Sequence, residues 1–399
     1  MDSKEYINGA EKVLLHTYNR YPVIFEKGEG VYLYDTDGNR YLDFASGIGV
    51  MGLGYGNKEY TDALCDQATR LLHTSNLFYS DVLKSAAERV IRATGMDRVF
   101  FTNSGTEAIE GAIKAAKKYA YDKDGTTDHE MIAFNSSFHG RSLGALSVTG
   151  KEAYRKPFEG LIPGIRFADF NDLDSVESLI NEKTCAIIVE VVQGEGGIHK
   201  ATTEFMEGLD RLRTEHGLLL IFDEVQCGMG RTGKMFAYEH YGVKPDIVAM
   251  AKALGCGVPV GGFALTENVA EHSLVPGDHG STYGGNPLVL SAVNKVLEIM
   301  ERDNIPAHVE KISEVLFSRL DDLKVKYKFI KDIRGIGLMA GLKFSDDIKA
   351  GDIVNDAREK GLIVITAEEN VLRLLPPLII DEQNVDEAAS ILDEVFSLK

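Results

Sequence analysis

Two adjacent carboxylates, Asp223 and Glu224, follow a run of aliphatic residues in the segment LLLIFDEVQ (residues 218–226). A continuous apolar run of this length is typical of a fully buried strand in a parallel sheet. Because parallel sheets bind ligands at the carboxyl ends of their strands, Asp223 stands where a site would form. A buried carboxylate needs a compensating cation, which could be a lysine, an arginine, a metal ion or a protonated ring nitrogen. We expect no metal, since Glu224 would point to the opposite side of the strand and no His cluster joins the pair.

A lysine follows the next apolar segment in a similar way. In DIVAMAKALG (residues 246–255), Lys252 comes directly after the predicted strand. A lysine in this position is either a solvated charge or a reactive amine, and the spacing alone does not separate the two. Because Asp223 and Lys252 end neighbouring predicted strands, both could face one pocket.

A possible anion site lies where FFTNSGTEA (residues 100–108) runs from a predicted strand directly into a helix. The free N–H groups and the dipole at a helix start attract a phosphate or a carboxylate. Gly105 allows close approach of the backbone, and the Thr106 hydroxyl adds a donor. Alternatively, Ser104 or Thr106 only caps the helix.

An aromatic side chain and a cation, Phe138 and Arg141, occur together in the loop SSFHGRSLG (residues 136–144). Taken singly, Phe138 is more typical of a core and Arg141 of a surface. Together with a phosphate site, a strand-end aspartate and a strand-end lysine, they suggest a single ligand. Pyridoxal 5'-phosphate has the matching groups: a phosphate, a basic ring nitrogen, an aromatic face and an aldehyde that reacts with amines.

A second glycine-rich segment, GMGRTGK (residues 228–234), matches the letters of both a dinucleotide fingerprint and a P-loop. The residues EVQC separate it from the preceding strand, and Met235 stands where a P-loop requires Ser or Thr. We therefore interpret this segment as a loop that binds no nucleotide.

Strand and helix signals alternate from about residue 61 onward, which predicts an α/β fold with a mostly parallel sheet covered by helices. Residues 31–44 (VYLYDTDGNRYLDF) predict a hairpin around an Asp-Gly turn. We predict a large domain at residues 46–295 and a smaller α/β C-terminal domain at residues 296–399. The N-terminal segment, residues 1–45, is expected to pack with the smaller domain.

The composition excludes several classes of protein. A formal net charge of −18 argues against a surface that binds nucleic acid or an acidic membrane. The four cysteines form no CxxC pair, which argues against a disulfide framework or a structural zinc site. No apolar run approaches membrane-spanning length, and the N-terminal residues do not resemble a signal peptide. These features predict a soluble cytoplasmic protein.

Several motifs resemble, in order and spacing, those of the class III (subgroup II) pyridoxal-phosphate aminotransferases, which have fold type I. Within that class, the resemblance is to enzymes that transfer the ω-amino group of N2-acetyl-L-ornithine to 2-oxoglutarate in arginine biosynthesis. The similarity extends from about residue 20 to residue 380. The motifs are NSGTEA, SFHGRSLGALSVTG, VVQGEGG, LLLIFDEVQCGMGRTGKMFAYE, PDIVAMAKALG, HGSTYGGNP, IRGIGLM and RLLPPL.

This resemblance implies a role for each cofactor residue. Lys252 would bond covalently to pyridoxal 5'-phosphate, and Asp223 would pair with its protonated ring nitrogen. A homodimer with shared active sites is also implied, because one phosphate contact would come from the second subunit. The other contacts would be made by Val225 and Phe138 on the two ring faces, Gln226 at the phenolic oxygen, Gly105 and Thr106 at the phosphate, and Thr282 of the second subunit.

The resemblance also implies how two substrates share one site. Arg373 would bind the α-carboxylate of glutamate, and Glu195 would mask Arg373 while the ω-amine donor is bound. Arg141 would hold the carboxylate of the donor, and Ser281 would contact substrate. The products would be N-acetyl-L-glutamate 5-semialdehyde and L-glutamate.

Other activities remain open from the sequence. Aminotransferases for succinylornithine, succinyldiaminopimelate, ornithine or 4-aminobutyrate share nearly all of these motifs. Glutamate-1-semialdehyde aminomutase, an isomerase, shares the fold and Lys252 but needs no external keto acid. A cofactor-binding protein without catalysis is a third alternative.

Overall fold

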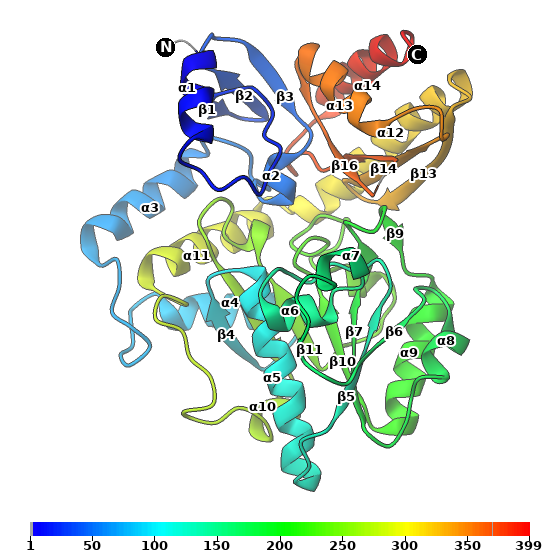
Figure 1. Ribbon diagram of the computed structural model, residues 1–399. Helices are drawn as coiled ribbons and strands as arrows, with labels where there is room; N and C mark the ends of the chain where they lie inside the picture. The colour runs from blue at the N-terminus through cyan, green and yellow to red at the C-terminus, as the bar shows by residue number, and fades with distance from the viewer. Residues whose placement is uncertain (1–2, 369) are drawn as a thin grey trace.

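The computed structural model describes residues 3–368 and 370–399 of the chain. Its centre is a seven-stranded sheet in the order β4-β12-β11-β10-β7-β5-β6 (Figure 1). β12 runs antiparallel to both of its neighbours and the other pairs in this sheet are parallel, so the sheet is mostly parallel, as predicted. The strands are β4 (Arg98–Thr102), β5 (Glu130–Phe134), β6 (Ile165–Ala168), β7 (Thr184–Glu190), β10 (Leu219–Asp223), β11 (Ile247–Met250) and β12 (Gly261–Leu265).

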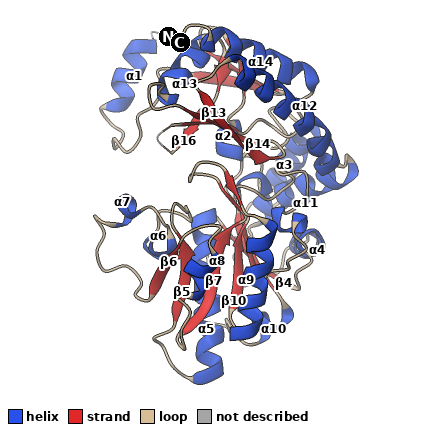
Figure 2. Cartoon of the chain, turned by 90° about the vertical axis from the view of Figure 1, so that its right-hand side faces the viewer, coloured by secondary structure: helices blue, strands red, loops and turns tan. Residues whose placement is uncertain are grey.

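Helices cover both faces of this sheet (Figure 2), which explains why its central strands are continuously apolar. Alternate residues of β10 point to opposite faces: Ile221 packs in the same cluster as α5 (Gly105–Asp124), and Phe222 packs in the same cluster as α9 (Thr203–His216). α5 lies very close to the sheet, because a Cβ atom at Gly111 would be only 2.1 Å from the ring of Phe263.

Further helices occur between residues 46 and 302. Gly95 ends α4 in the left-handed conformation, with φ 62°, which is common for a glycine at the C-terminal end of a helix. The helices are α2 (Ser46–Gly49), α3 (Lys58–Arg70), α4 (Leu83–Thr94), α6 (Leu143–Val148), α7 (Glu152–Arg155), α8 (Leu173–Glu177), α10 (Glu267–Glu271) and α11 (Pro287–Arg302), with 3₁₀ turns at Ala237–His240 and Lys252–Leu254.

Two four-stranded sheets lie beyond the central one. One has the order β13-β14-β17-β16, with antiparallel pairs throughout. Its strands and the helices near them are β13 (Ile330–Ile336), β14 (Met339–Phe344), β16 (Ile365–Ala367), β17 (Val371–Leu374), α12 (Ile305–Lys326), α13 (Ala350–Glu359) and α14 (Glu382–Phe396). A separate two-stranded ribbon consists of β8 (Val192–Gln193) and β9 (His199–Lys200).

The other four-stranded sheet joins the beginning of the chain to its C-terminal part. β2 (Tyr32–Asp35) and β3 (Arg40–Asp43) form the predicted hairpin, and β1 (Phe25–Glu29) pairs with β2. The last strand, β15 (Leu362–Ile363), lies parallel to β3. α1 (Ser3–Glu11) precedes this sheet. The division of the chain at residues 45 and 295 remains a prediction.

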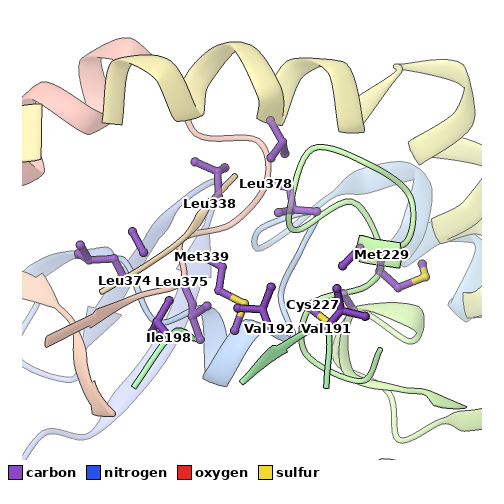
Figure 3. Packing of buried hydrophobic residues seen from close by; sticks show 14 of the residues in the cluster. Val191, Val192, Ile198, Cys227, Met229, Leu338, Met339, Leu374, Leu375 and Leu378 are labelled. Carbon is purple, nitrogen blue, oxygen red and sulfur yellow. The ribbon is translucent and has the colours of Figure 1, made fainter. Parts of the chain in front are cut away.

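A shared apolar core joins the central sheet to the β13–β17 sheet (Figure 3). It contains residues that follow β7 and β10 and residues at the ends of β14 and β17, namely Val191, Val192, Cys227, Met229, Leu338, Met339, Leu374 and Leu375. Burial of each large aliphatic side chain of this kind contributes about 1.5–3 kcal/mol. The position of β17 relative to β10 is therefore fixed by packing.

The segment GMGRTGK forms a loop, as predicted, and it reinforces this junction. Arg231 is fully buried, and its Nη1 donates to the carbonyl oxygens of Leu338, at 3.0 Å, and Pro376. Burial lowers the pKa of Arg231 to about 9, although the charge of Asp43 raises it. The loop after β10 thus holds the segment that follows β17.

Two properties of the described residues bear on function. None of their helices combines the length and the apolar character needed to cross a bilayer. Residues 3–368 and 370–399 also contain no group of three or more His, Cys, Asp or Glu side chains arranged to hold a metal ion.

Candidate active site

Asp223 and Lys252 lie side by side at the carboxyl ends of two parallel strands. Asp223 ends β10 and pairs in register with Ala249 of β11, and Lys252 follows β11 by two residues. Both side chains line one cavity of about 470 Å³. The two strand-end residues singled out in the sequence therefore share one pocket.

The carboxylate of Asp223 is 4% exposed and is held by two donors. Nδ1 of His139 lies 2.7 Å from Oδ2, and the backbone N–H of Val225 donates to Oδ1 at 3.0 Å. Burial alone would lower the pKa of His139, but the hydrogen bond and charge of Asp223 and the charge of Glu190 raise it overall. Within the described residues, the side chain that hydrogen-bonds to Asp223 is thus His139, for which the sequence suggested no role.

Glu190 is a second residue that sequence reasoning missed. It ends β7, pairs in register with Asp223 and lines the same cavity. Its Oε2 accepts from the backbone N–H of Phe138 at 3.0 Å, so it holds the aromatic loop in place. Burial raises the pKa of Glu190 to about 7, with His139 lowering it and Asp223 raising it. A carboxylate at the end of an apolar strand was the available signal, the same one that identified Asp223.

Lys252 is half-buried and lines the cavity. Its pKa is lowered first by burial and then by the charge of Arg373, while the charge of Asp223 opposes the shift. A lowered pKa increases the fraction of neutral amine, which is the form that attacks a carbonyl or accepts a proton. This favours the reactive amine over the solvated charge.

The anion site at the start of α5 contains both features that the sequence left as alternatives. Ser104 caps the helix, because its hydroxyl accepts from the Glu107 N–H at 3.3 Å. Gly105 and Thr106 line the cavity, and their N–H groups have no acceptor within the helix. A Cβ atom at position 105 would lie 2.9 Å from Cγ1 of Val225, so a glycine is needed there. The cap and the open N–H groups coexist.

The three residues expected around a bound ring all line the cavity: Phe138, Val225 and Gln226. Glu224 faces the other way, as its position on the strand predicted. Its carboxylate accepts from the N–H groups of Ala237 and Tyr238, both at 2.9 Å. Glu224 therefore supports a neighbouring turn and does not line the cavity.

Arg373 reaches this site from β17 and is paired with Glu195. Nη1 of Arg373 donates to Oε1 of Glu195 at 2.7 Å and to Oε1 of Gln226 at 3.3 Å. The Arg373 side chain is 3% exposed, whereas that of Glu195 is 34% exposed. The buried arginine is thus covered by a carboxylate that reaches solvent.

Arg141 also lines the cavity, but no carboxylate of the described residues pairs with it. Its guanidinium lies over two aromatic rings instead, at 3.8 Å from the centre of Tyr154 and 5.4 Å from that of Phe138. The cavity is thus lined by one unpaired arginine, Arg141. The second, Arg373, does not line the cavity and lies against two of its lining residues, Glu195 and Gln226.

Ser281 and Thr282 do not line the cavity of this chain. The Ser281 hydroxyl accepts from Nδ2 of Asn103 at 3.1 Å and from the Gly284 N–H at 2.9 Å. Thr282 is exposed. Their predicted roles, with Thr282 acting on the site of a second subunit, remain predictions.

Comparisons with known proteins agree over nearly the whole chain. The model of the family Aminotransferase class-III matches residues 14–396. An acetylornithine aminotransferase of Methanocaldococcus jannaschii is 43% identical over 397 residues, which are 100% of this chain and 99% of the relative. An acetylornithine aminotransferase of Clostridium acetobutylicum is 46% identical over 386 residues, which are 96% of this chain and 99% of the relative.

Solved structures show the same likeness. The ornithine aminotransferase of Toxoplasma gondii superposes with a TM-score of 0.95 at 30% identity. That match covers 100% of this chain and 96% of the other.

Proposed function

Because the chain belongs to the class-III aminotransferase family, we propose that it transfers the ω-amino group of N2-acetyl-L-ornithine to 2-oxoglutarate. The products are N-acetyl-L-glutamate 5-semialdehyde and L-glutamate, a step that would serve arginine biosynthesis. The observation that carries this proposal is the different state of two arginines, one lining the cavity and one behind its lining residue Glu195. Arg373 is paired and Arg141 is unpaired, which suits two substrates that each present a carboxylate at a different place.

Pyridoxal 5'-phosphate is the cofactor of this family, and the cavity fits it. A half-buried lysine with a lowered pKa suits its aldehyde, and the open N–H groups at the start of α5 suit its phosphate. Its positively charged ring nitrogen suits the buried Asp223. The residues that would hold it are Lys252 through a covalent bond, Asp223 at the ring nitrogen, Phe138 and Val225 at the ring faces, Gln226 at the phenolic oxygen, and Gly105 and Thr106 at the phosphate.

When bound, the cofactor supplies an aldehyde that bonds to amines and a protonated ring that withdraws electrons from the carbon being deprotonated. The chain supplies the proton transfers and the binding. Lys252, once the donor's amine has released it from its covalent bond, would accept the proton from the substrate carbon, because its lowered pKa increases the fraction of neutral amine. His139 holds the carboxylate of Asp223 in position. Arg141 holds the carboxylate of the donor.

Glu195 decides which substrate the cavity accepts. While Glu195 is paired with Arg373, the positive charge of Arg373 is neutralised and does not repel a donor that presents an ω-amine near the cofactor. When glutamate or 2-oxoglutarate enters, its α-carboxylate replaces Glu195 in a bidentate pair with Arg373. Because Glu195 is partly exposed to solvent, its carboxylate is not left buried and unpaired when it separates from Arg373. The incoming carboxylate then pairs with Arg373, which would otherwise be an unpaired buried cation.

We also propose that two copies of the chain form a homodimer with shared sites. Large apolar side chains are exposed next to Thr282, including Leu77 at 86%, Tyr79 at 95% and Tyr283 at 64%. Asn76 connects the segment of Leu77 and Tyr79 to the segment of Thr282, because its Nδ2 donates to the carbonyl oxygens of Ser281 and Gly284. An apolar patch of this kind marks a protein interface. Its continuity with Thr282 supports a dimer in which Thr282 reaches the partner's site.

Ornithine is the competing donor, because the solved structure of the Toxoplasma gondii enzyme is named for it. The test is a donor panel: N-acetylornithine, ornithine and 4-aminobutyrate, each mixed with the cofactor-loaded protein without keto acid. Conversion of the cofactor is followed by absorbance, and 2-oxoglutarate is then added to reverse it. We expect the highest kcat/KM with N-acetylornithine. A higher value with ornithine would overturn the proposed donor. Repeated turnover without keto acid, beyond a single conversion of the cofactor, would indicate an isomerase.

A further inference from the structure

A second cavity, of about 290 Å³, opens beside the cofactor cavity. The two share Phe138 and Glu195 as lining residues. The other walls come from the loop after β5 and from α7, which lies at the end of the large sheet that faces the rest of the chain (Figures 1 and 2). We call it the tail cavity, and its lining includes Ser136, Lys151, Glu152, Tyr154 and Glu368.

Tyr154 is the contact between the tail cavity and Arg141. The Arg141 guanidinium lies 3.8 Å from the centre of the Tyr154 ring, and Nζ of Lys151 lies 5.0 Å from that centre. Phe138 meets the same ring edge to face, with centroids 6.5 Å apart and an interplanar angle of 89°. A cation over an aromatic face is attracted to it but keeps its N–H donors for another partner. Tyr154 therefore orients Arg141 while leaving it able to bind a carboxylate.

The charges of the tail cavity limit what it accepts. Three carboxylates line it, those of Glu152, Glu195 and Glu368, against the single ammonium group of Lys151. A further negative charge would be repelled there, whereas a short uncharged group would not. A donor that carries its carboxylate on Arg141 and an uncharged substituent on its α-nitrogen matches this arrangement.

We propose that the tail cavity receives the uncharged N-acyl group of the amino donor, and that Tyr154 is a positioning residue that holds Arg141 for the carboxylate of the same donor. This inference rests on the proposed function, since it concerns the donor of that reaction. It adds a reason for choosing acetyl over acidic tails, which lies in Tyr154 and the acidic lining of the tail cavity.

The first test replaces Tyr154 with Leu and with Phe. Each half-reaction is followed by cofactor absorbance, with N-acetylornithine or with glutamate. Tyr154→Leu is expected to lower kcat/KM for N-acetylornithine at least about fivefold, because the cation–π contact is lost, and to leave the glutamate half-reaction within about twofold. Tyr154→Phe keeps the aromatic face and should restore the wild-type value. Tyr121→Leu is the matched control, since Tyr121 also lies beside a lysine, Lys118, but lines neither cavity.

A second readout measures binding without turnover. N-acetyl-L-norvaline has the carboxylate and the acyl group of the donor but no ω-amine, so calorimetry with the cofactor-loaded protein reports the tail contacts alone. Tyr154→Leu should weaken its binding by the same factor as it lowers kcat/KM. N-succinyl-L-ornithine should be the poorer donor in the wild type, and Glu152→Lys should improve it several-fold at low salt and less at high salt.

The outcomes separate the two proposals. If the wild type prefers ornithine to N-acetylornithine, the proposed function fails and this inference falls with it. If N-acetylornithine is the preferred donor and Tyr154→Leu changes neither its kcat/KM nor the binding of N-acetyl-L-norvaline, only the tail cavity is refuted. An equal loss in both half-reactions would also refute it, because a general structural defect would then explain the result.

Discussion

Nδ1 of His139 lies 2.7 Å from Oδ2 of Asp223, and both side chains are buried at the end of β10. The pair places a hydrogen-bond donor to the carboxylate within the chain itself. Asp223 is consequently oriented before any ligand binds. The geometry gives His139 a role in cofactor binding that neither its type nor its position in the loop indicated.

Replacement of His139 by Phe should weaken cofactor binding. A hydrogen bond to a charged group contributes about 1.5–3 kcal/mol, so the dissociation constant is expected to rise by roughly one to two orders of magnitude. His139→Asn, which retains an N–H donor, should lose less. Titration of the apoprotein with pyridoxal 5'-phosphate, followed by absorbance, measures both values. Unchanged affinity in His139→Phe would show that Asp223 does not depend on this partner.

Glu224→Gln should change the pH dependence of stability more than it changes activity. Burial raises the pKa of Glu224 to about 7, from an ordinary value of 4.5, although hydrogen bonds from Ala237 and Tyr238 lower it. Between these two values the folded protein holds one more proton than the unfolded chain, so this group makes stability fall as the pH rises from 4.5 to 7. The contribution is about 3 kcal/mol at most.

The variant should therefore show a smaller loss of unfolding free energy over that pH interval, measured by urea denaturation at pH 5 and pH 7. Its kcat/KM should stay within a few-fold of wild type, because Glu224 faces away from the cavity. Asp223→Ala is the contrasting variant and should lose most activity. Equal losses in the two variants would argue against the separate roles of these neighbours.

Glu195→Ala should shift preference between the two substrates. Without Glu195, Arg373 remains a buried cation open to any carboxylate, so the KM for 2-oxoglutarate is expected to fall. The ω-amine donor is then repelled by the unpaired positive charge of Arg373, and the kcat/KM for this donor should fall by about tenfold. Steady-state kinetics with each substrate varied in turn gives both parameters. Parallel changes in both half-reactions would contradict the masking role.

Two inactive variants should restore activity to each other if the dimer shares its sites. Lys252→Ala inactivates the site of its own chain, whereas Thr282→Trp is expected to block the phosphate position in the partner's site. A heterodimer of the two then has one intact site, and random mixing should recover roughly a quarter of wild-type activity. Mixing Lys252→Ala with a Lys252→Arg variant is the control and should recover none. No recovery in the first mixture would place Thr282 outside the partner's site.

The strand-end residues show how much of the site could be predicted from sequence. Asp223 and Lys252 each follow an apolar run, and a parallel sheet brings such ends together, so local pattern and topology sufficed. The hairpin at residues 31–44 and the helix after Gly105 were predicted for similar reasons, since turn and capping residues act locally. The antiparallel direction of β12 could not be read from its apolar run alone, because such runs look alike in either direction.

Residues brought in by tertiary packing were harder to predict. Arg373 lies on β17, far along the chain, and only resemblance assigned it to the site; the packed junction of Figure 3 is what places it beside Lys252. Glu190 was missed although it ends an apolar strand, and Tyr154 was missed because a lone tyrosine in a short polar segment, here α7, carries no signal. Their importance arises from contacts that form only when separate loops meet.

The most direct test of the account concerns the attachment of the cofactor to Lys252. The protein is loaded with pyridoxal 5'-phosphate, reduced with borohydride, digested, and the modified peptide is identified by mass spectrometry. We predict that the cofactor is found on Lys252, in the peptide that contains AKALG, and that Lys252→Ala folds normally but carries none and has no turnover. Attachment to another lysine, or full activity of Lys252→Ala, would contradict the account.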